Sequence, residues 1–270
     1  HLVVRPGEFE FIDDVVWSPD GRALLCLASR SHYLINALVD LEGDREHPQK
    51  RHRPLPSGKV KPRHALMAAF TLVALALLLG FWLSRGFGLI LLLYLTLMLS
   101  YTFFLRKTVI LDVFAIAGGF VLRAVAGAVV LAIPISPWLY IVTALGALFI
   151  AFTKRKQELV LLADNAANHR STLKEYTPKL LDELIGVVAP ATVMAYSLYT
   201  FSAESLPRNH AMMLTIPFVL YGVFRYLYLL QVRGWGGSPE DVLLQDRPLL
   251  LTVLLWALTA GALLFLYRGG

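Results

Sequence analysis

Apolar runs long enough to cross a bilayer recur along this chain from residue 65 onward. A hydrocarbon core of about 30 Å needs roughly 20 helical residues, and seven runs come close to that length. They do not alternate as barrel strands do, and barrel segments are about half as long. The 57% hydrophobic content is typical of a membrane helix bundle. The predicted helices are Ala65–Leu83, Gly86–Leu105, Ile110–Ile133, Trp138–Thr153, Leu180–Phe201, Ala211–Gln231 and Leu249–Tyr267.

An eighth helix is predicted around Arg22–Glu42, which is amphipathic. We therefore expect an all-α, polytopic transmembrane bundle of about eight helices, forming one integral-membrane domain over residues 1–270. Cys26 is the only cysteine, so an intrachain disulfide is impossible and a thiolate metal cluster is not expected. The chain opens at His1 rather than Met, so we expect a fragment or a trimmed product. Acidic residues interrupt the place where a signal peptide's apolar core would lie, so no signal peptide is predicted.

Positive residues are distributed unevenly between the two ends of the predicted helices. Seventeen Lys and Arg residues lie in the links 42–64, 106–108, 154–179 and 232–248. The opposite end has only Arg85, Arg208 and Arg268. The positive-inside rule then places the long links on the cytoplasmic side of the cell membrane, where we expect the functional site.

Asn36, Asp40 and Asp44 are spaced four residues apart, which places them on one helix face with about 6 Å of rise between neighbours. Glu42 points away from this face. Mg²⁺ prefers oxygen ligands and commonly takes one or two carboxylates, completing its shell with water and substrate phosphates. We predict a catalytic site formed by Asn36, Asp40 and Asp44, in which Asp40 and Asp44 are the Mg²⁺ ligands. The alternative is a solvated helix end whose acids pair with Arg45 or Lys50.

Basic residues suited to phosphate follow this acidic ladder and recur at the ends of other predicted helices. Any single Lys there is also explained as an ordinary membrane-side anchor, whereas Arg155 and Glu158 share one helix face. Arg123 lies mid-helix, where a charge normally faces the bundle interior, snorkels, or pairs with an internal carboxylate. The predicted phosphate-binding residues are Lys50, Arg51, Arg53, Tyr101, Lys107, Arg123, Lys154, Arg155, Glu158 and Arg170.

Three other features have competing interpretations. Arg225 also lies mid-helix, with the same alternatives as Arg123. Asp112 is explained by favourable interaction with a helix N-terminus, and a functional role is the lesser alternative. The link 236–248 is either a lid over the phosphate site or the capped start of a helix. The histidines show no metal-ligand spacing, so no role is predicted for them.

The segment "NALVDLEGDREHPQKRHRPLPSG" resembles the first Asp-rich motif, N-x-x-x-D-x-x-x-D, of the UbiA superfamily of membrane prenyltransferases. Within it, "YTFFLRKTVILDVFAIAGGFVLRAVAGA" and "FTKRKQELVLL" are most similar to the decaprenyl-phosphate phosphoribosyltransferases. The second motif expected of aromatic prenyltransferases, D-x-x-x-D, is absent, because Asp164 stands alone. The resemblance also implies nine helices and an Asp at position 37. Here that residue is Ala37, the first helix is missing or degenerate, and residues 1–32 are divergent.

The resemblance implies Mg²⁺-dependent transfer of 5-phosphoribosyl from phosphoribosyl diphosphate to a polyprenyl phosphate, releasing pyrophosphate. Three anionic centres in one pocket require several fixed cations, which agrees with the basic residues above. One alternative is a UbiA-type prenyltransferase acting on an aromatic or other acceptor. A second is an inactive relative or a non-enzymatic membrane protein. Membrane lipids are expected partners, a nucleic acid is not, and the sequence predicts no oligomeric state.

Overall fold

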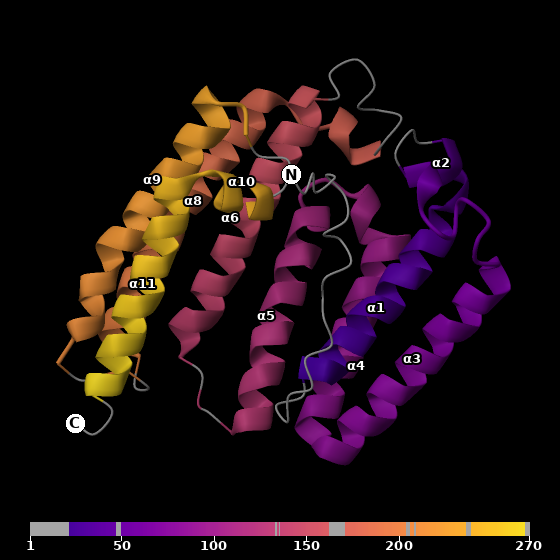
Figure 1. Cartoon of the computed structure of the whole chain (residues 1–270), viewed down its shortest axis with the longest axis horizontal. Coiled ribbons are helices and arrows are strands. Elements are labelled where there is room, and N and C mark those ends of the chain that lie inside the picture. Colours follow the sequence, from indigo (N-terminus) through magenta and orange to yellow (C-terminus); the bar gives the residue numbers. More distant parts are fainter. Residues whose placement is uncertain are drawn as a thin grey trace, which may run out of the picture. The chain divides into compact units, whose positions relative to one another are not determined.

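The structure is a computed structural model that describes residues 22–46, 50–132, 134, 136–161, 171–203, 206–207, 209–235 and 239–267. The described residues form helices joined by short links, with no strand among them (Figure 1). They separate into two compact units. Unit 1 is His1–Thr102 with Val125–Ile133, and unit 2 is Phe103–Ala124 with Pro134–Gly270.

Unit 1 is built on α1 (Arg22–Val39), which packs along α3 (Pro62–Leu83). The short α2 (Leu41–Glu46) and η2 (Lys50–His52) follow α1, and α4 (Arg85–Phe103) follows α3. The turn between α3 and α4 is tight because glycine permits close approach: a Cβ on Gly88 would lie 2.5 Å from the Phe81 ring. A side chain at position 88 would therefore displace the Phe81 ring.

Unit 2 contains the larger core. After η3 (Leu105–Lys107), its helices gather Phe152, Leu181 and Leu229 in one buried cluster. The most extensive packing is between α6 and α8. Its remaining elements are α5 (Leu111–Leu131) as far as Ala124, α6 (Pro137–Leu161), η4 (Ser171–Lys174), α8 (Pro178–Ser202), η5 (Ala211–Thr215), α9 (Ile216–Val232), α10 (Pro239–Gln245) and α11 (Arg247–Leu266).

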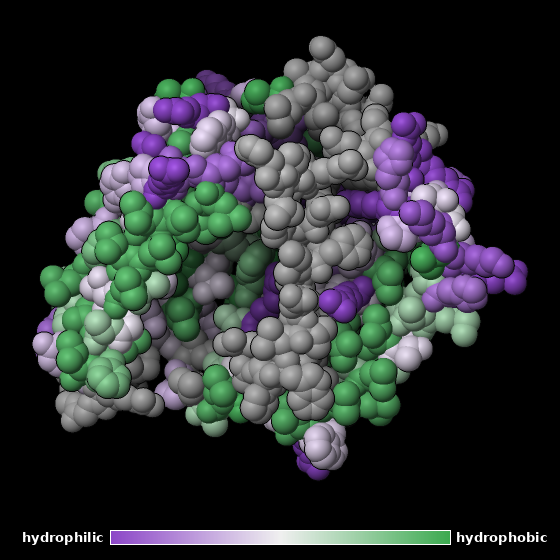
Figure 2. All heavy atoms as spheres, viewed as in Figure 1, coloured by the Kyte–Doolittle hydropathy of each residue, from purple (hydrophilic) through white to green (hydrophobic). Residues whose placement is uncertain are grey.

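Large apolar side chains on both units face outward. Trp82 on α3 is 84% exposed and Phe265 on α11 is 78% exposed, and Figure 2 shows apolar atoms over much of the visible surface. Within the described residues, seven helices are long and apolar enough to cross a membrane. Outward apolar faces on helices of that length are stable in lipid rather than in water, so the chain is a multi-pass membrane protein.

The seven predicted spans are confirmed with small shifts at most ends. The largest difference is in α6, which continues to Leu161 instead of ending near Thr153. Lys, Arg, Gln and Glu favour helix, and Arg155 pairs with Glu158 three residues later, so the charged segment extends the helix. The eighth helix is α1, which ends at Val39, before the predicted Glu42.

Candidate functional site

The acidic ladder lies where α1 passes into α2. The Asp40 amide donates to the Asn36 carbonyl at 2.9 Å, and the Asp44 amide donates to the Asp40 carbonyl at 2.8 Å. Helical hydrogen bonding therefore continues across the junction, which keeps the three side chains on one face. Asp44 is buried, Asn36 and Asp40 are half-buried, and Glu42 is exposed.

The basic segment after the ladder folds back onto it. Arg53 Nη1 lies 3.7 Å from Asp44 Oδ2. A turn follows, in which the Ser57 amide donates to the Arg53 carbonyl at 3.0 Å and Gly58 takes a φ of +78°. Arg51 is exposed, and Lys50 lies in η2 with its side chain outside the described set. Acid and base thus meet at one helix end, which suits a metal beside a phosphate.

The donor set limits which metal could bind here. Across the described ranges, no three His, Cys, Asp or Glu side chains are grouped so that they could hold a metal ion. Asp40 and Asp44, with the Asn36 amide beside them, therefore offer only part of a coordination shell, and its donors are oxygens. That fits Mg²⁺, which commonly keeps several waters and takes substrate phosphate oxygens as its remaining ligands.

His32 extends the ladder by one turn on its N-terminal side and connects it to α4. Its Nε2 lies 3.0 Å from Thr102 Oγ1, and Thr102 Oγ1 donates to the Met98 carbonyl at 3.1 Å. A hydrogen bond between the His32 ring and the Thr102 hydroxyl therefore links α1 to α4. The ring centroid is 6.5 Å from that of Tyr101, a predicted phosphate-binding residue. Sequence reasoning missed His32, although its spacing of four residues from Asn36 was the available signal.

Unit 2 holds a buried network of charged and polar groups around Asp112. Arg155 Nε donates to Asp112 Oδ2 at 3.1 Å, and Arg155 Nη1 donates to Glu158 Oε2 at 2.8 Å. The Tyr176 hydroxyl donates to Asp112 Oδ1 at 2.9 Å and accepts from the Ile110 amide at 2.8 Å. Burial raises the pKa of Tyr176 well above its usual range, so the phenol stays protonated. Asp112 is thus one member of an ion-pair network joining α5, α6 and the segment before α8.

The other predicted phosphate ligands lie in different surroundings. Lys107 and Lys154 are exposed. Arg123 Nε donates to the Gly119 carbonyl at 3.3 Å, and its guanidinium lies 4.4 Å from the Phe120 ring centroid. Arg170 lies outside the described residues.

The link before α11 serves as a helix start. Arg225 pairs with Asp246 through two hydrogen bonds, Nε to Oδ1 at 3.0 Å and Nη2 to Oδ2 at 2.8 Å. Asp246 also accepts from the Leu249 amide at 3.0 Å and so caps α11. Its hydrogen bonds with Arg225 hold the pKa of the Asp246 carboxyl below its usual range. Among the interpretations of Arg225, pairing with an internal carboxylate is confirmed. The part of the link that forms α10 packs against the core through Val242.

The family match and the relatives that are similar in sequence agree with one another. Residues 22–234 match the UbiA prenyltransferase family. The chain is 32% identical over 265 residues to a decaprenyl-phosphate phosphoribosyltransferase of Mycolicibacterium smegmatis, covering 96% of this chain and 83% of the relative. An enzyme of the same name from Mycobacterium tuberculosis is 34% identical over 236 residues, covering 87% of this chain and 78% of the relative.

A solved structure also matches. A UbiA homolog from Archaeoglobus fulgidus, bound to DMAPP and Mg²⁺, superposes with a TM-score of 0.70 and 19% sequence identity, covering 91% of this chain and 88% of that one. At that identity the match concerns the fold.

Proposed function

Because the chain belongs to the UbiA prenyltransferase family and is a transferase, we propose that it moves a 5-phosphoribosyl group from phosphoribosyl diphosphate to a polyprenyl phosphate. The reaction would take place at the cytoplasmic face of the cell membrane and depend on Mg²⁺. Support comes from the names of relatives that match nearly the whole chain. The structural observation that carries the proposal is the ladder of Asn36, Asp40 and Asp44 with Arg53 beside it.

The reaction breaks the anomeric C–O bond to pyrophosphate and forms a new C–O bond to the lipid phosphate. Mg²⁺ held by Asp40 and Asp44 would supply positive charge next to the departing pyrophosphate. Arg53, 3.7 Å from Asp44, is placed to orient a phosphate at the same helix end. The lipid phosphate is already an anion near pH 7, so the attack needs no strong general base.

Two basic residues of unit 2, Arg155 and Lys154, also support the proposal. Arg155 is held by Asp112 and Glu158 and therefore keeps one orientation. Lys154, next to it on α6, is exposed and suited to contact an incoming phosphate. The second candidate function is prenyl transfer to an aromatic or other acceptor, which is favoured by the fold shared with the homolog bound to DMAPP.

The test uses the purified protein in phospholipid vesicles with labelled phosphoribosyl diphosphate and decaprenyl phosphate, with and without Mg²⁺. A labelled lipid that forms only with Mg²⁺ supports the proposal. Parallel reactions with a prenyl diphosphate and an aromatic acceptor test the second candidate. A folded protein that gives product only in those reactions excludes phosphoribosyl transfer, and one that gives no product in either points to an inactive relative.

Site assignment needs matched variants. Asp40→Asn and Asp44→Asn should each abolish Mg²⁺-dependent turnover, while Glu42→Gln should leave it unchanged because Glu42 is exposed and off the ladder face. Equal activity in all three variants would show that the Mg²⁺ site does not lie on this helix. Ala37→Asp, which restores the carboxylate expected at that position, should maintain or increase the rate.

A further inference from the structure

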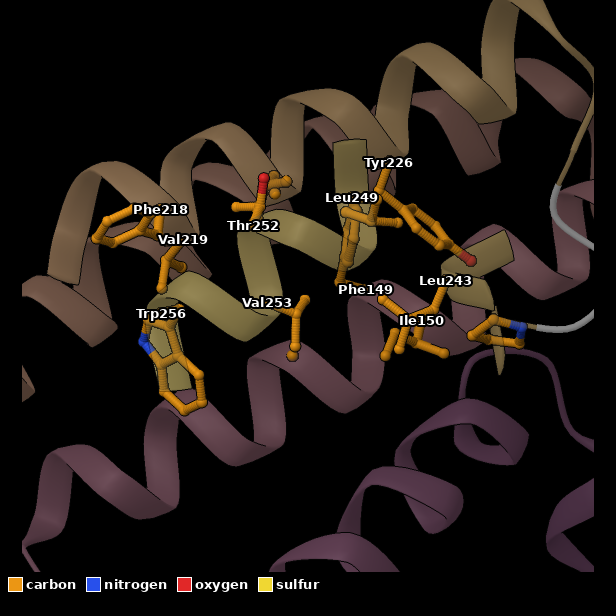
Figure 3. A pocket seen from close by; sticks show the side chains of 14 residues that line it. Phe149, Ile150, Phe218, Val219, Tyr226, Leu243, Leu249, Thr252, Val253 and Trp256 are labelled. Atoms are coloured by element: carbon orange, nitrogen blue, oxygen red, sulfur yellow. The ribbon is translucent and has the colours of Figure 1, made fainter. Parts of the chain in front are cut away.

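An apolar pocket of about 400 Å³ lies within unit 2, between α6, α9, α10 and α11 (Figure 3). Along α9 it extends from Phe218 to Tyr226, and along α11 from Leu249 to Trp256. At 1.5 Å of rise per residue, these segments are about 12 Å and 10 Å long. The pocket is therefore a slot that follows the helix axes, within segments that we assign to the membrane.

The lining presents hydrocarbon to whatever occupies the slot. Phe149, Val219 and Leu243 are among its wall residues. Three lining residues carry polar side-chain atoms. Thr252 Oγ1 donates to the Pro248 carbonyl at 2.7 Å, and Trp256 Nε1 donates to the Tyr196 hydroxyl at 2.7 Å. The third is Tyr226, whose hydroxyl is buried. Water is disfavoured in an apolar space of this kind, whereas an unfilled space loses dispersion contacts along its whole wall.

Cationic side chains occur at one end of the slot. Arg233 caps α9 seven residues beyond Tyr226, and Arg247 lies two residues before Leu249; both are exposed. Arg225, at the same end, is already held by Asp246. Exposed guanidinium groups beside an apolar slot in a membrane protein suit the phosphate of a lipid headgroup.

We propose that this pocket binds one acyl chain of a membrane phospholipid, with the headgroup phosphate near Arg233 and Arg247. None of the lining residues belongs to the predicted phosphate-transfer set. The inference is independent of the proposed transferase activity. It assigns the pocket a stabilising lipid that completes the packing of α9 and α11 against α6.

Gly222 provides a direct way to fill the slot. It lines the pocket, and a Cβ built there meets no atom within 4 Å. Gly222→Leu should therefore occupy the slot without disturbing the backbone. Gly261→Leu is the matched control, because Gly261 lies on α11, is exposed, also has open space around its Cβ, and does not line the pocket.

The experiment reconstitutes the full chain with phosphatidylglycerol that carries a photoreactive diazirine in its acyl chain, and maps labelled peptides by mass spectrometry. We expect label at Val219 and Val253 in the unsubstituted protein and in Gly261→Leu. In Gly222→Leu it should fall roughly tenfold, because overpacking an occupied site is strongly unfavourable. Absence of label at these positions, or equal labelling of Gly222→Leu and the control, would overturn the proposal.

Two further measurements keep the result decisive. Brominated acyl chains should quench the fluorescence of the unsubstituted protein more than that of Trp256→Phe, a comparison that does not depend on how Gly222→Leu folds. Stoichiometric decaprenyl phosphate should leave the label in place. Displacement by that lipid would assign the slot to the substrate tail and refute a phospholipid site.

Discussion

Arg155 Nε lies 3.1 Å from Asp112 Oδ2, and the two side chains are 4% and 0% exposed. The two residues are separated by 43 positions and come from different helices, α6 and α5. Glu158 and Tyr176 bond to the same two groups, so most of the charge is compensated inside the protein. A compensated network contributes little net free energy, but removing one member disturbs the charge balance and costs stability.

Asp112→Asn should therefore destabilise the protein. Breaking a buried pair so that one charge is left alone costs about 3–5 kcal/mol. In this variant Asn still accepts from Tyr176 and Glu158 still pairs with Arg155, so we expect a loss below that range. Thermal unfolding of the detergent-solubilised protein, followed by circular dichroism, should show a clearly lower Tm. Lys154→Gln on the same helix is exposed and should leave Tm unchanged; equal Tm values for both variants would show that the Asp112 pair carries no stability.

Acid should weaken the contact between Arg225 and Asp246. The pKa of Asp246 is lower in the folded protein than its ordinary value, because the folded state favours the carboxylate. Its contribution to stability is therefore fully present above the unfolded pKa of about 3.9 and is lost as pH falls through the lower folded value. We therefore expect protonation of Asp246 to lower Tm below about pH 4.

Asp246→Asn is the variant that isolates this effect. Asn caps helices about as well as Asp, so α11 keeps its cap while the ion pair with Arg225 is lost. The variant should have a lower Tm at neutral pH and a smaller Tm decrease on acidification than the unsubstituted protein. Asp241→Asn, an exposed change in α10, is the control. An acid dependence that is undiminished in Asp246→Asn would assign the effect to other carboxylates.

His32 should act as a positioning residue for the ladder. Its hydrogen bond to Thr102 joins α1 to α4, and a net hydrogen bond of about 0.5–1.5 kcal/mol corresponds to a change of roughly two- to tenfold. In the proposed reaction, His32→Ala should raise the Mg²⁺ concentration needed for half-maximal activity by that factor. His32→Gln keeps a hydrogen-bonding group at the end of the side chain and should restore much of the Mg²⁺ affinity.

The control for His32 is Ser31→Ala, which removes a hydrogen bond that stays within α1. If Ser31→Ala shifts the Mg²⁺ dependence as much as His32→Ala, the effect reflects the stability of α1 rather than the link to α4. A loss of Tm in His32→Ala with unchanged Mg²⁺ dependence would also limit His32 to packing.

Arg53→Gln should separate metal binding from phosphate binding. Arg53 now shares the Asp44 carboxylate at 3.7 Å, and removing its charge leaves that carboxylate more available to a cation. We expect a lower Mg²⁺ requirement together with a KM for phosphoribosyl diphosphate that is higher by roughly ten- to a hundredfold, because a charge-assisted bond contributes about 1.5–3 kcal/mol. Steady-state kinetics over a Mg²⁺ series measures both. Arg63→Gln, exposed on α3, should change neither; parallel shifts in both constants would contradict the separation.

The membrane spans and the ladder could be read from local pattern. Bilayer thickness sets the length of an apolar helix, so the runs near Pro62–Leu83 and Arg247–Leu266 were identifiable without any tertiary information. The spacing of Asn36, Asp40 and Asp44 likewise defines one helix face wherever the helix lies. The predicted end of α6 was too early because the length of an apolar run does not indicate whether the polar residues after it continue the helix.

The sequence by itself thus determined a polytopic helical membrane protein with an acidic ladder and a basic segment after it. Only the tertiary structure decided which charges compensate one another: Asp112 with Arg155, Asp246 with Arg225, and Asp44 with Arg53. It also placed His32 against Thr102, 70 positions away, and enclosed the apolar slot between four helices. The physical reason is that helical periodicity specifies the face on which a residue lies, whereas its partner depends on which helices pack together.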